Sequence, residues 1–176
     1  MAQLIVLSAI GADRPGVVRD ISKVVVECGG NIEESRMVAL GSEFAVLMLI
    51  SGNWHTLTKL EKALQDLTEH DDLTINLKKT SARSDQADCI PYGLDVVCLD
   101  QPGIVFHLAD FFASRGIEIA DVATRRFAAA HTGAPMFSVQ MTASIPGKMP
   151  IAQLRDDFLD LCEQLNLDSI LEPIKQ

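Results

Sequence analysis

Aromatic residues are scarce in this chain of 176 residues, which holds one Trp, one Tyr and seven Phe. Sheet modules that bind single-stranded RNA stack bases on aromatic side chains and carry positive charge. Here the formal net charge is −9, because 24 acidic residues outnumber 15 Lys and Arg. An acidic chain also repels the phosphate backbone of DNA. The composition therefore predicts no direct contact with nucleic acid.

Long apolar runs and paired cysteines are absent too. The apolar run 4–10 has no basic segment before it and is broken by Gly11 and Asp13, which is too soon for a signal peptide or a membrane span. The cysteines contain no C-x-x-C pair and predict buried, reduced thiols rather than a disulfide or a metal site. They are Cys28, Cys89, Cys98 and Cys162. We expect a cytoplasmic protein with no membrane contact, metal or cofactor.

The sequence also lacks a recognisable set of catalytic side chains. Its four histidines have no Ser, Cys or carboxylate partner at a spacing typical of a hydrolase. They are His55, His70, His107 and His131. A single His is more often a surface or core residue than a catalyst, so we expect no enzymatic activity.

What is present is one unit that occurs twice. The segment ADRPGVV at 12–18 returns as LDQPGIV at 99–105, an offset of 87 residues. With this offset six positions between 13 and 37 are identical, where about one or two matches are expected by chance. The repeat predicts two domains, over 1–79 and 90–176. The polar stretch 80–89 is the expected linker between them.

Hydrophobic periodicity predicts the same element order, β-α-β-β-α-β, in both copies. The first copy is expected to contain strand 3–10, helix 16–28, strands 31–40 and 44–50, helix 54–67 with Asn53 as its N-cap, and strand 73–78. The second is expected to contain strand 92–99, a helix from Ile104 that Gly116 ends, strands 117–130 and 136–145, helix 151–165 and strand 168–174. Pro173 restricts the last strand to a sheet edge or marks its end.

A Pro-Gly pair lies between the first strand and the first helix of each copy. We expect Pro15 and Pro102 at the first helical position, where a missing N–H costs nothing. Gly16 and Gly103 would then let a ligand approach the helix N-terminus, where the helix dipole favours a carboxylate. The same pattern is also typical of an ordinary tight turn, and the motif alone leaves both interpretations open.

These motifs together resemble the tandem ACT-domain proteins, and among them the family of glycine cleavage system transcriptional repressors. The resemblance covers nearly the whole chain and rests on the opening strand, on GADRPG at 11–16, on GGNI at 29–32 and on DQPG at 100–103. It implies an α+β fold of two ferredoxin-like βαββαβ domains, each an antiparallel sheet with helices on one face. The other sheet face, where apolar, would favour pairing of the two units or of two chains.

The resemblance also implies a ligand between the first turn and the start of the second strand. The residues that it marks are Asp13, Arg14, Pro15, Gly16, Asn31 and Ile32, with Asp100, Gln101, Pro102, Gly103 and Glu118 in the second copy. Asp13 and Asn31 offer acceptors to an ammonium group, or else they cap their own turns. Because Gln101 replaces Arg14 and Glu118 replaces Asn31, we expect the second site to be degenerate or differently selective.

The function that the resemblance implies is an amino-acid-sensing regulator that represses transcription of the glycine cleavage system. Glycine or serine is the expected ligand, and the protein is expected to form a homodimer. Its acidity and the absence of a helix-turn-helix motif indicate repression through a DNA-bound activator protein rather than through DNA itself. The alternative is a free-standing ACT regulatory subunit of an enzyme of amino-acid metabolism.

Overall fold

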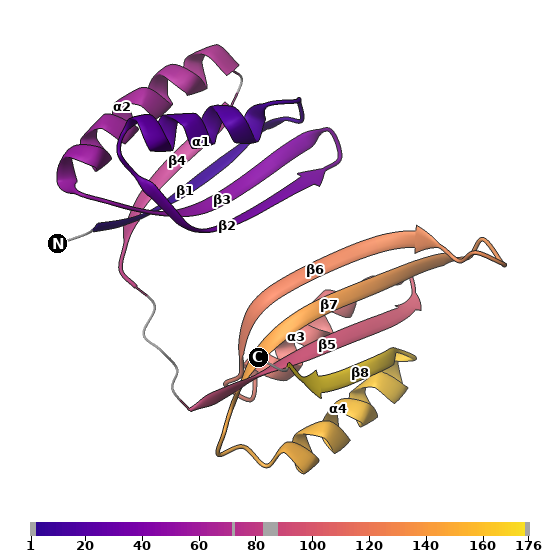
Figure 1. Cartoon of the computed structure of the whole chain (residues 1–176). Helices are drawn as coiled ribbons and strands as arrows, with labels where there is room; N and C mark the ends of the chain where they lie inside the picture. The colour runs from indigo at the N-terminus through magenta and orange to yellow at the C-terminus, as the bar shows by residue number, and fades with distance from the viewer. Residues whose placement is uncertain (1–2, 72, 83–87, 175–176) are drawn as a thin grey trace. The chain divides into compact units, whose positions relative to one another are not determined.

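The computed structural model describes residues 3–71, 73–82 and 88–174. The chain divides into two compact units, Met1–Ser84 and Asp85–Gln176, and each has its own hydrophobic core (Figure 1). Residues 83–87 of the expected linker lie outside the described part, so the linker and the domain limits at 79 and 90 stay predictions.

Unit 1 is a four-stranded antiparallel sheet in the order β2-β3-β1-β4, with both helices on one face (Figure 1). Its elements are β1 (Gln3–Ala12), α1 (Val17–Glu27), β2 (Asn31–Leu40), β3 (Glu43–Gly52), α2 (Trp54–Asp71) and β4 (Leu73–Thr80). Alternation along β1 buries Ile5 and Leu7 beneath the helices and leaves Val6 on the opposite face, which we call the open face.

Local signals fix one end of each helix of unit 1. The backbone N–H of Thr56 donates to Asn53 Oδ1 over 3.0 Å, so the predicted N-cap of α2 is confirmed. At the end of α1, Gly29 has a φ of +76°, and the Gly30 N–H donates to Val25 O over 2.9 Å. This is the glycine C-cap that the Gly-Gly pair predicts, and it turns the chain directly into β2.

Unit 2 repeats the architecture, with a sheet in the order β6-β7-β5-β8 and both helices on one face. Its elements are β5 (Cys89–Leu99), α3 (Ile104–Ala113), β6 (Glu118–Ala128), β7 (Pro135–Pro146), α4 (Ile151–Leu165) and β8 (Asp168–Pro173). Phe111, Phe112 and Phe158 contact one another in its core. As Pro173 predicts, β8 is an edge strand. The α+β fold class with two ferredoxin-like units is confirmed.

Two expectations about the cysteines need correction. Strand β5 begins at Cys89 rather than at Tyr92, because Cys89 pairs with Pro146 and extends the ladder with β7. Cys89 therefore lies in a strand and not in the linker. All four cysteines are free thiols, but only Cys98 and Cys162 are buried, while Cys28 and Cys89 are half-buried. In the described ranges, no helix is both long enough and apolar enough to cross a membrane.

Candidate ligand-binding turns

The turn between β1 and α1 is built around a left-handed glycine. Gly16 is the N-cap of α1, with φ +99° and ψ −8°, a conformation that residues with a Cβ rarely adopt. The Asp13 N–H donates to Ser42 O over 2.9 Å, which holds the turn against the β2–β3 hairpin. Pro15 lies before the N-cap, so the expectation that it occupies the first helical position is wrong. The left-handed glycine inserts one more residue between Pro15 and the helix.

The N-terminus of α1 presents amide groups at this turn. Among the described residues no side chain caps the helix. The Val17 N–H makes only a long bond of 3.4 Å to Arg14 O, and the first N–H that bonds within the α-helical pattern is that of Asp20, to Gly16 O over 2.9 Å. The first turn therefore keeps the partial positive charge of a helix N-terminus.

Three charged side chains surround Gly16. Arg14 Nη1 donates to Asp20 Oδ2 over 2.9 Å, and Arg19 Nε donates to Asp20 Oδ1 over 2.9 Å. Arg14 first, and then Arg19, hold the pKa of the Asp20 carboxyl below its ordinary value. A Cβ at Gly16 would lie 3.2 Å from Arg19 Nη2. Two guanidinium groups therefore share one carboxylate beside the helix N-terminus.

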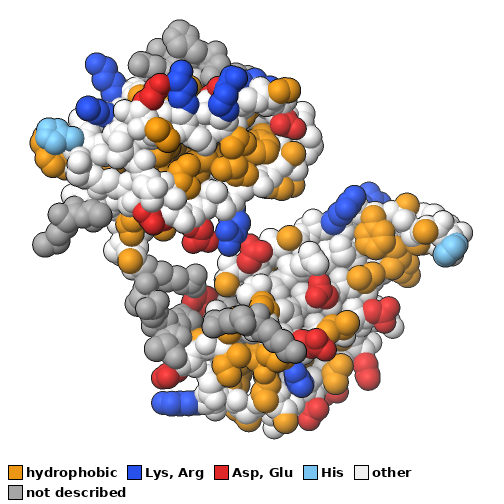
Figure 2. Space-filling model, in the orientation of Figure 1, with side chains coloured by type: hydrophobic (Ala, Val, Ile, Leu, Met, Phe, Trp, Pro, Cys, Tyr) orange, Lys and Arg blue, Asp and Glu red, His pale blue; other side chains and the backbone are white. Residues whose placement is uncertain are grey.

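The carboxylate of Asp13 completes the turn of unit 1. It has no hydrogen bond or ion pair among the residues that the structure describes. Figure 2 shows several Lys and Arg side chains along the helix-covered side of this unit, although the chain as a whole is acidic. The turn thus offers an uncapped helix N-terminus and two cations to an anionic group, and one carboxylate to a cationic group.

The turn of unit 2 has the same backbone but different chemistry. Gly103 is the left-handed N-cap of α3, with φ +90°, so Pro102 also precedes the helix and the expectation for it is wrong too. Gln101 Nε2 donates to the carbonyl of Leu165, the last residue of α4, over 2.9 Å. Phe106 replaces Arg19 in this copy. The side chains of this turn supply no cation beside the helix N-terminus.

The two aspartates that open the turns also differ. Asp100 Oδ2 accepts from Arg126 Nε over 2.7 Å, an ion pair within unit 2. The position of Arg126 in the repeat is Ala39 in unit 1, which explains why Asp13 lacks this partner. Unit 2 therefore neutralises its own aspartate, whereas Asp13 has no such partner among the described residues of unit 1.

The strand residues that were expected to join the turn lie at the other end of the sheet. Asn31 pairs with Ser51, whereas the turn lies beside the hairpin that β3 leaves at Glu43. These two positions of β3 are eight residues apart, about 26 Å at a rise of about 3.3 Å per residue. Ile32, next to Asn31, packs against the core. Neither residue meets the turn within unit 1.

Asn31 takes part in a local hydrogen-bond group instead. Its Nδ2 donates to Glu33 Oε1 over 2.9 Å, and the Ser51 hydroxyl donates to the same oxygen. These bonds, that of Ser51 first, lower the pKa of Glu33. In unit 2, Glu118 pairs with Ser144 at the corresponding end of the sheet, equally far from Gly103.

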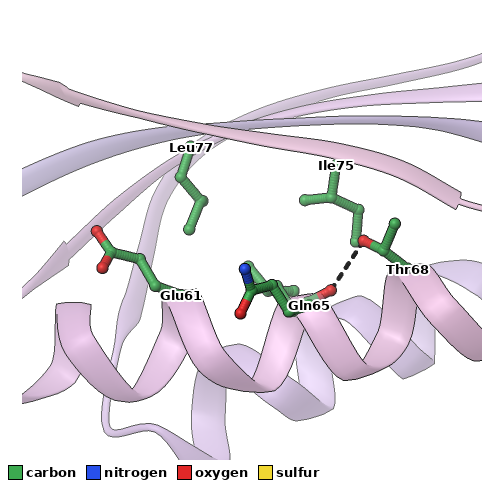
Figure 3. A pocket seen from close by; sticks show the side chains of 6 residues that line it. Glu61, Gln65, Thr68, Ile75 and Leu77 are labelled. Atoms are coloured by element: carbon green, nitrogen blue, oxygen red, sulfur yellow. Dashed lines mark hydrogen bonds between the residues drawn. The ribbon is translucent and has the colours of Figure 1, made fainter.

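Two hollows that the sequence analysis did not predict lie away from the turns, each between a helix and an edge strand. One of about 280 Å³ separates α2 from the edge strand β4, where Glu61 and Gln65 face Ile75 and Leu77 (Figure 3). Thr68 Oγ1 donates to the backbone carbonyl of Leu64 within α2. A hollow of about 270 Å³ occupies the same place between α4 and β8. The lining residues come from segments distant in sequence, so periodicity and motifs carry no signal for them.

Comparison with known proteins supports this fold over the whole chain. The ACT domain family matches residues 3–78. The glycine cleavage system transcriptional repressor of Escherichia coli (strain K12) is 35% identical over 162 residues, which are 92% of this chain and 85% of that protein. The protein of the same name from Shigella flexneri matches to the same extent.

Two crystal structures are similar along their full length. One is of a protein assigned as a glycine cleavage system transcriptional repressor, with a TM-score of 0.76 and 30% identity over 100% of this chain and 99% of that one. The other is of an unknown protein from Galdieria sulphuraria, with a TM-score of 0.80 and 26% identity over 99% and 100% of the two chains. Both ACT units are thus matched together, in tandem.

Proposed function

This chain belongs to the tandem ACT-domain family of glycine cleavage system transcriptional repressors, and we propose that it senses a small amino acid at the turn Asp13–Gly16. The observation that carries the proposal is the uncapped N-terminus of α1 at Gly16, with Arg19 held beside it by Asp20. An α-carboxylate would accept hydrogen bonds from the first-turn amides and from Arg19. The α-ammonium would bind Asp13.

Glycine and serine are the proposed ligands, on the strength of the names of the relatives and of the space at the turn. Arg19 lies close against Gly16, so a ligand with a large side chain would have to displace it. The proposed role is regulatory rather than catalytic, because the matched relatives are repressors. We propose that the protein acts in the cytoplasm, where the transcription machinery of a bacterium lies.

The proposed mechanism of repression runs through a DNA-bound activator protein. A chain with a net charge of −9 is poorly suited to contact phosphates, so a partner must provide the contact with the promoter. The ligand acts by binding one state of the complex more tightly than the other. A tenfold release of the partner requires about 1.4 kcal/mol of coupling between the two sites.

The open face of the sheet in unit 1 is the proposed homodimer surface. Its exposed apolar side chains are Ile10, Val38, Leu40 and Leu47. The open face of unit 2 is a poorer partner for this apolar surface, because it carries Asp95, Gln140 and Arg125 in its centre. An apolar partner would remove water from these polar groups without forming hydrogen bonds or ion pairs with them. The open face of unit 1 carries the larger set of exposed aliphatic side chains, so we propose that the same face of a second chain covers it.

A mobility-shift titration on the promoter of the glycine cleavage genes tests the mechanism. The expected result is a supershift that appears only when the activator is present and that glycine weakens. A shift by this protein alone at physiological salt would contradict the partner model. If the activator leaves no supershift and the protein instead changes the activity of a purified enzyme of amino-acid metabolism, the alternative of a regulatory subunit is supported.

A further inference from the structure

Asp20 lies at the turn of unit 1 and contacts both of its arginines. Its backbone N–H donates to Gly16 O over 2.9 Å, which places it one helical turn after the left-handed glycine. Its Oδ2 accepts from Arg14 Nη1 and its Oδ1 from Arg19 Nε, each over 2.9 Å. The Asp20 side chain is only 20% exposed. A carboxylate held in this way can fix the direction in which a guanidinium points.

Arg19 is the side chain for which this contact matters most. Its side chain is 77% exposed, against 35% for that of Arg14. A long exposed side chain loses conformational entropy when it is ordered. Asp20 contacts it at two atoms, because Nη2 lies 2.8 Å from the same oxygen that accepts from Nε. Asp20 therefore holds the guanidinium along its Nε–Nη2 edge.

Another edge of the same guanidinium is available to a ligand. Nη2 lies 3.2 Å, and Cζ 3.5 Å, from the point where a Cβ at Gly16 would be, so the group lies directly beside the turn. Within the described ranges, Nη1 of Arg19 has no hydrogen bond or ion pair. Two N–H groups side by side on the Nη1–Nη2 edge match the two oxygens of a carboxylate. One guanidinium can thus bind Asp20 and an anion at the turn at the same time.

Unit 2 forms the same turn without this ion pair. The backbone N–H of His107 donates to Gly103 O over 3.0 Å, the bond that Asp20 makes in unit 1. The residue before it is Phe106, in place of Arg19. The two rings contact each other edge to face. The helix and its left-handed N-cap therefore form without a carboxylate and a guanidinium, so the pair in unit 1 is not required by the fold.

We infer that Asp20 is a positioning residue for the ligand carboxylate, because it holds Arg19 with a free edge of the guanidinium beside the turn. The inference rests on the proposed binding of an amino acid there and adds a residue that does not itself contact the ligand. A side chain ordered in advance does not have to be ordered when the ligand binds. The cation lies between Asp20 and the ligand, which offsets the repulsion between the two carboxylates.

Calorimetric titration of the full chain with glycine tests the inference through a double-mutant cycle. Asp20→Ala is expected to weaken glycine binding by about fivefold, equivalent to about 1 kcal/mol. In a chain that already carries Arg19→Ala, the same change is expected to have no further effect, because no guanidinium is left to hold. His107→Ala is the matched control in unit 2 and should bind glycine as the parent does. Circular dichroism establishes that each variant keeps its fold.

The Nε–H proton of Arg19 gives a readout that needs no ligand. In nitrogen-15-labelled protein without glycine, this proton is expected to exchange slowly with water, because it is bonded to Asp20 Oδ1. The slow exchange should be lost in Asp20→Ala and retained in His107→Ala. A residue that only stabilised the helix would leave this exchange unchanged.

Several results would overturn the inference while the proposed function stands. They are equal exchange of the Arg19 proton in the parent and in Asp20→Ala, glycine binding in Asp20→Ala that is as tight as in the parent, and a fivefold loss that persists beside Arg19→Ala. If the parent chain itself gives no heat with glycine at millimolar concentration, the proposed function fails and the inference fails with it.

Discussion

The two ACT units place a left-handed glycine at the same turn but use the surrounding side chains differently. In unit 1 the turn carries two arginines on Asp20, and Asp13 has no partner among the described residues. In unit 2 the turn is tied into its own unit by Gln101 on Leu165 and by Asp100 on Arg126. The backbone of the turn is therefore common to both units, and the chemistry around it depends on a few side chains.

The open faces of the two sheets also differ, and here unit 1 is the more apolar of the two. Unit 1 exposes aliphatic residues there, including Leu47, and its hollow of about 180 Å³ is lined by Val6, Leu49 and Arg36 among others. Unit 2 places Gln140 where unit 1 has Leu47. The difference lies at matched positions of the same sheet, so it is set by side chains and not by the fold.

The largest effect is expected from the glycines of the turns. Gly16→Leu should abolish glycine binding, because its side chain would displace Arg19 from the helix N-terminus. Gly103→Leu is the matched control and should leave glycine binding intact. Both impose a left-handed conformation on a residue with a Cβ, at a cost of about 1–2 kcal/mol in the free energy of unfolding. Calorimetry and urea unfolding measure the two effects, and equal loss of binding in both variants would contradict the assignment to unit 1.

A smaller effect is expected on self-association. Leu47→Asp should weaken the homodimer by about 2 kcal/mol, or about 30-fold in the dissociation constant, because it buries a charge in the apolar contact. Gln140→Asp changes the equivalent position of unit 2 and should leave the dimer unchanged. Analytical ultracentrifugation over a range of concentrations measures both. A parent chain that stays monomeric throughout would remove the basis of this prediction.

Exchange of the turn residues sharpens the comparison further. Arg14→Gln gives unit 1 the residue of unit 2 and should weaken glycine binding by about fivefold, about 1 kcal/mol, because one of two cations is lost. Gln101→Arg should not create a second site, since Arg126 still neutralises Asp100. The number of sites from calorimetry decides this point. In this variant Asp100, the counterpart of Asp13, is still paired with Arg126. Two equivalent glycine sites would therefore show that an unpaired aspartate is not needed, and that Asp13 has no part in recognition.

The smallest effect concerns acid pH. The pKa of Asp20 in the folded chain lies below its ordinary value of 3.8, with Arg14 as the first cause. A depressed pKa stabilises the folded state above pH 3.8, and this stabilisation disappears as the pH falls through the lowered value. Asp20→Asn should therefore be less stable than the parent at neutral pH and converge with it in acid. Asp157→Asn should behave alike in unit 2, where Arg115 is the first cause of the lowered pKa.

Much of the fold follows from the sequence alone. Apolar alternation and helical periodicity depend on neighbours a few residues away, so the strands, the helices and their order were predictable. Gly29 and Asn53 act through hydrogen bonds to nearby backbone, and both predictions are confirmed. The duplication was visible because the turn of each unit requires glycine at the same place.

Tertiary structure alone decided which side chains meet. Asn31 is 15 residues from Gly16 in the sequence, but the helix between them returns the chain to the far end of the sheet. Gln101 reaches Leu165 across 64 residues, and the polar centre of the open face in unit 2 joins strands whose neighbours are set by the register of β7. A motif fixes the conformation of its own turn, whereas the partners of its side chains depend on how distant segments pack.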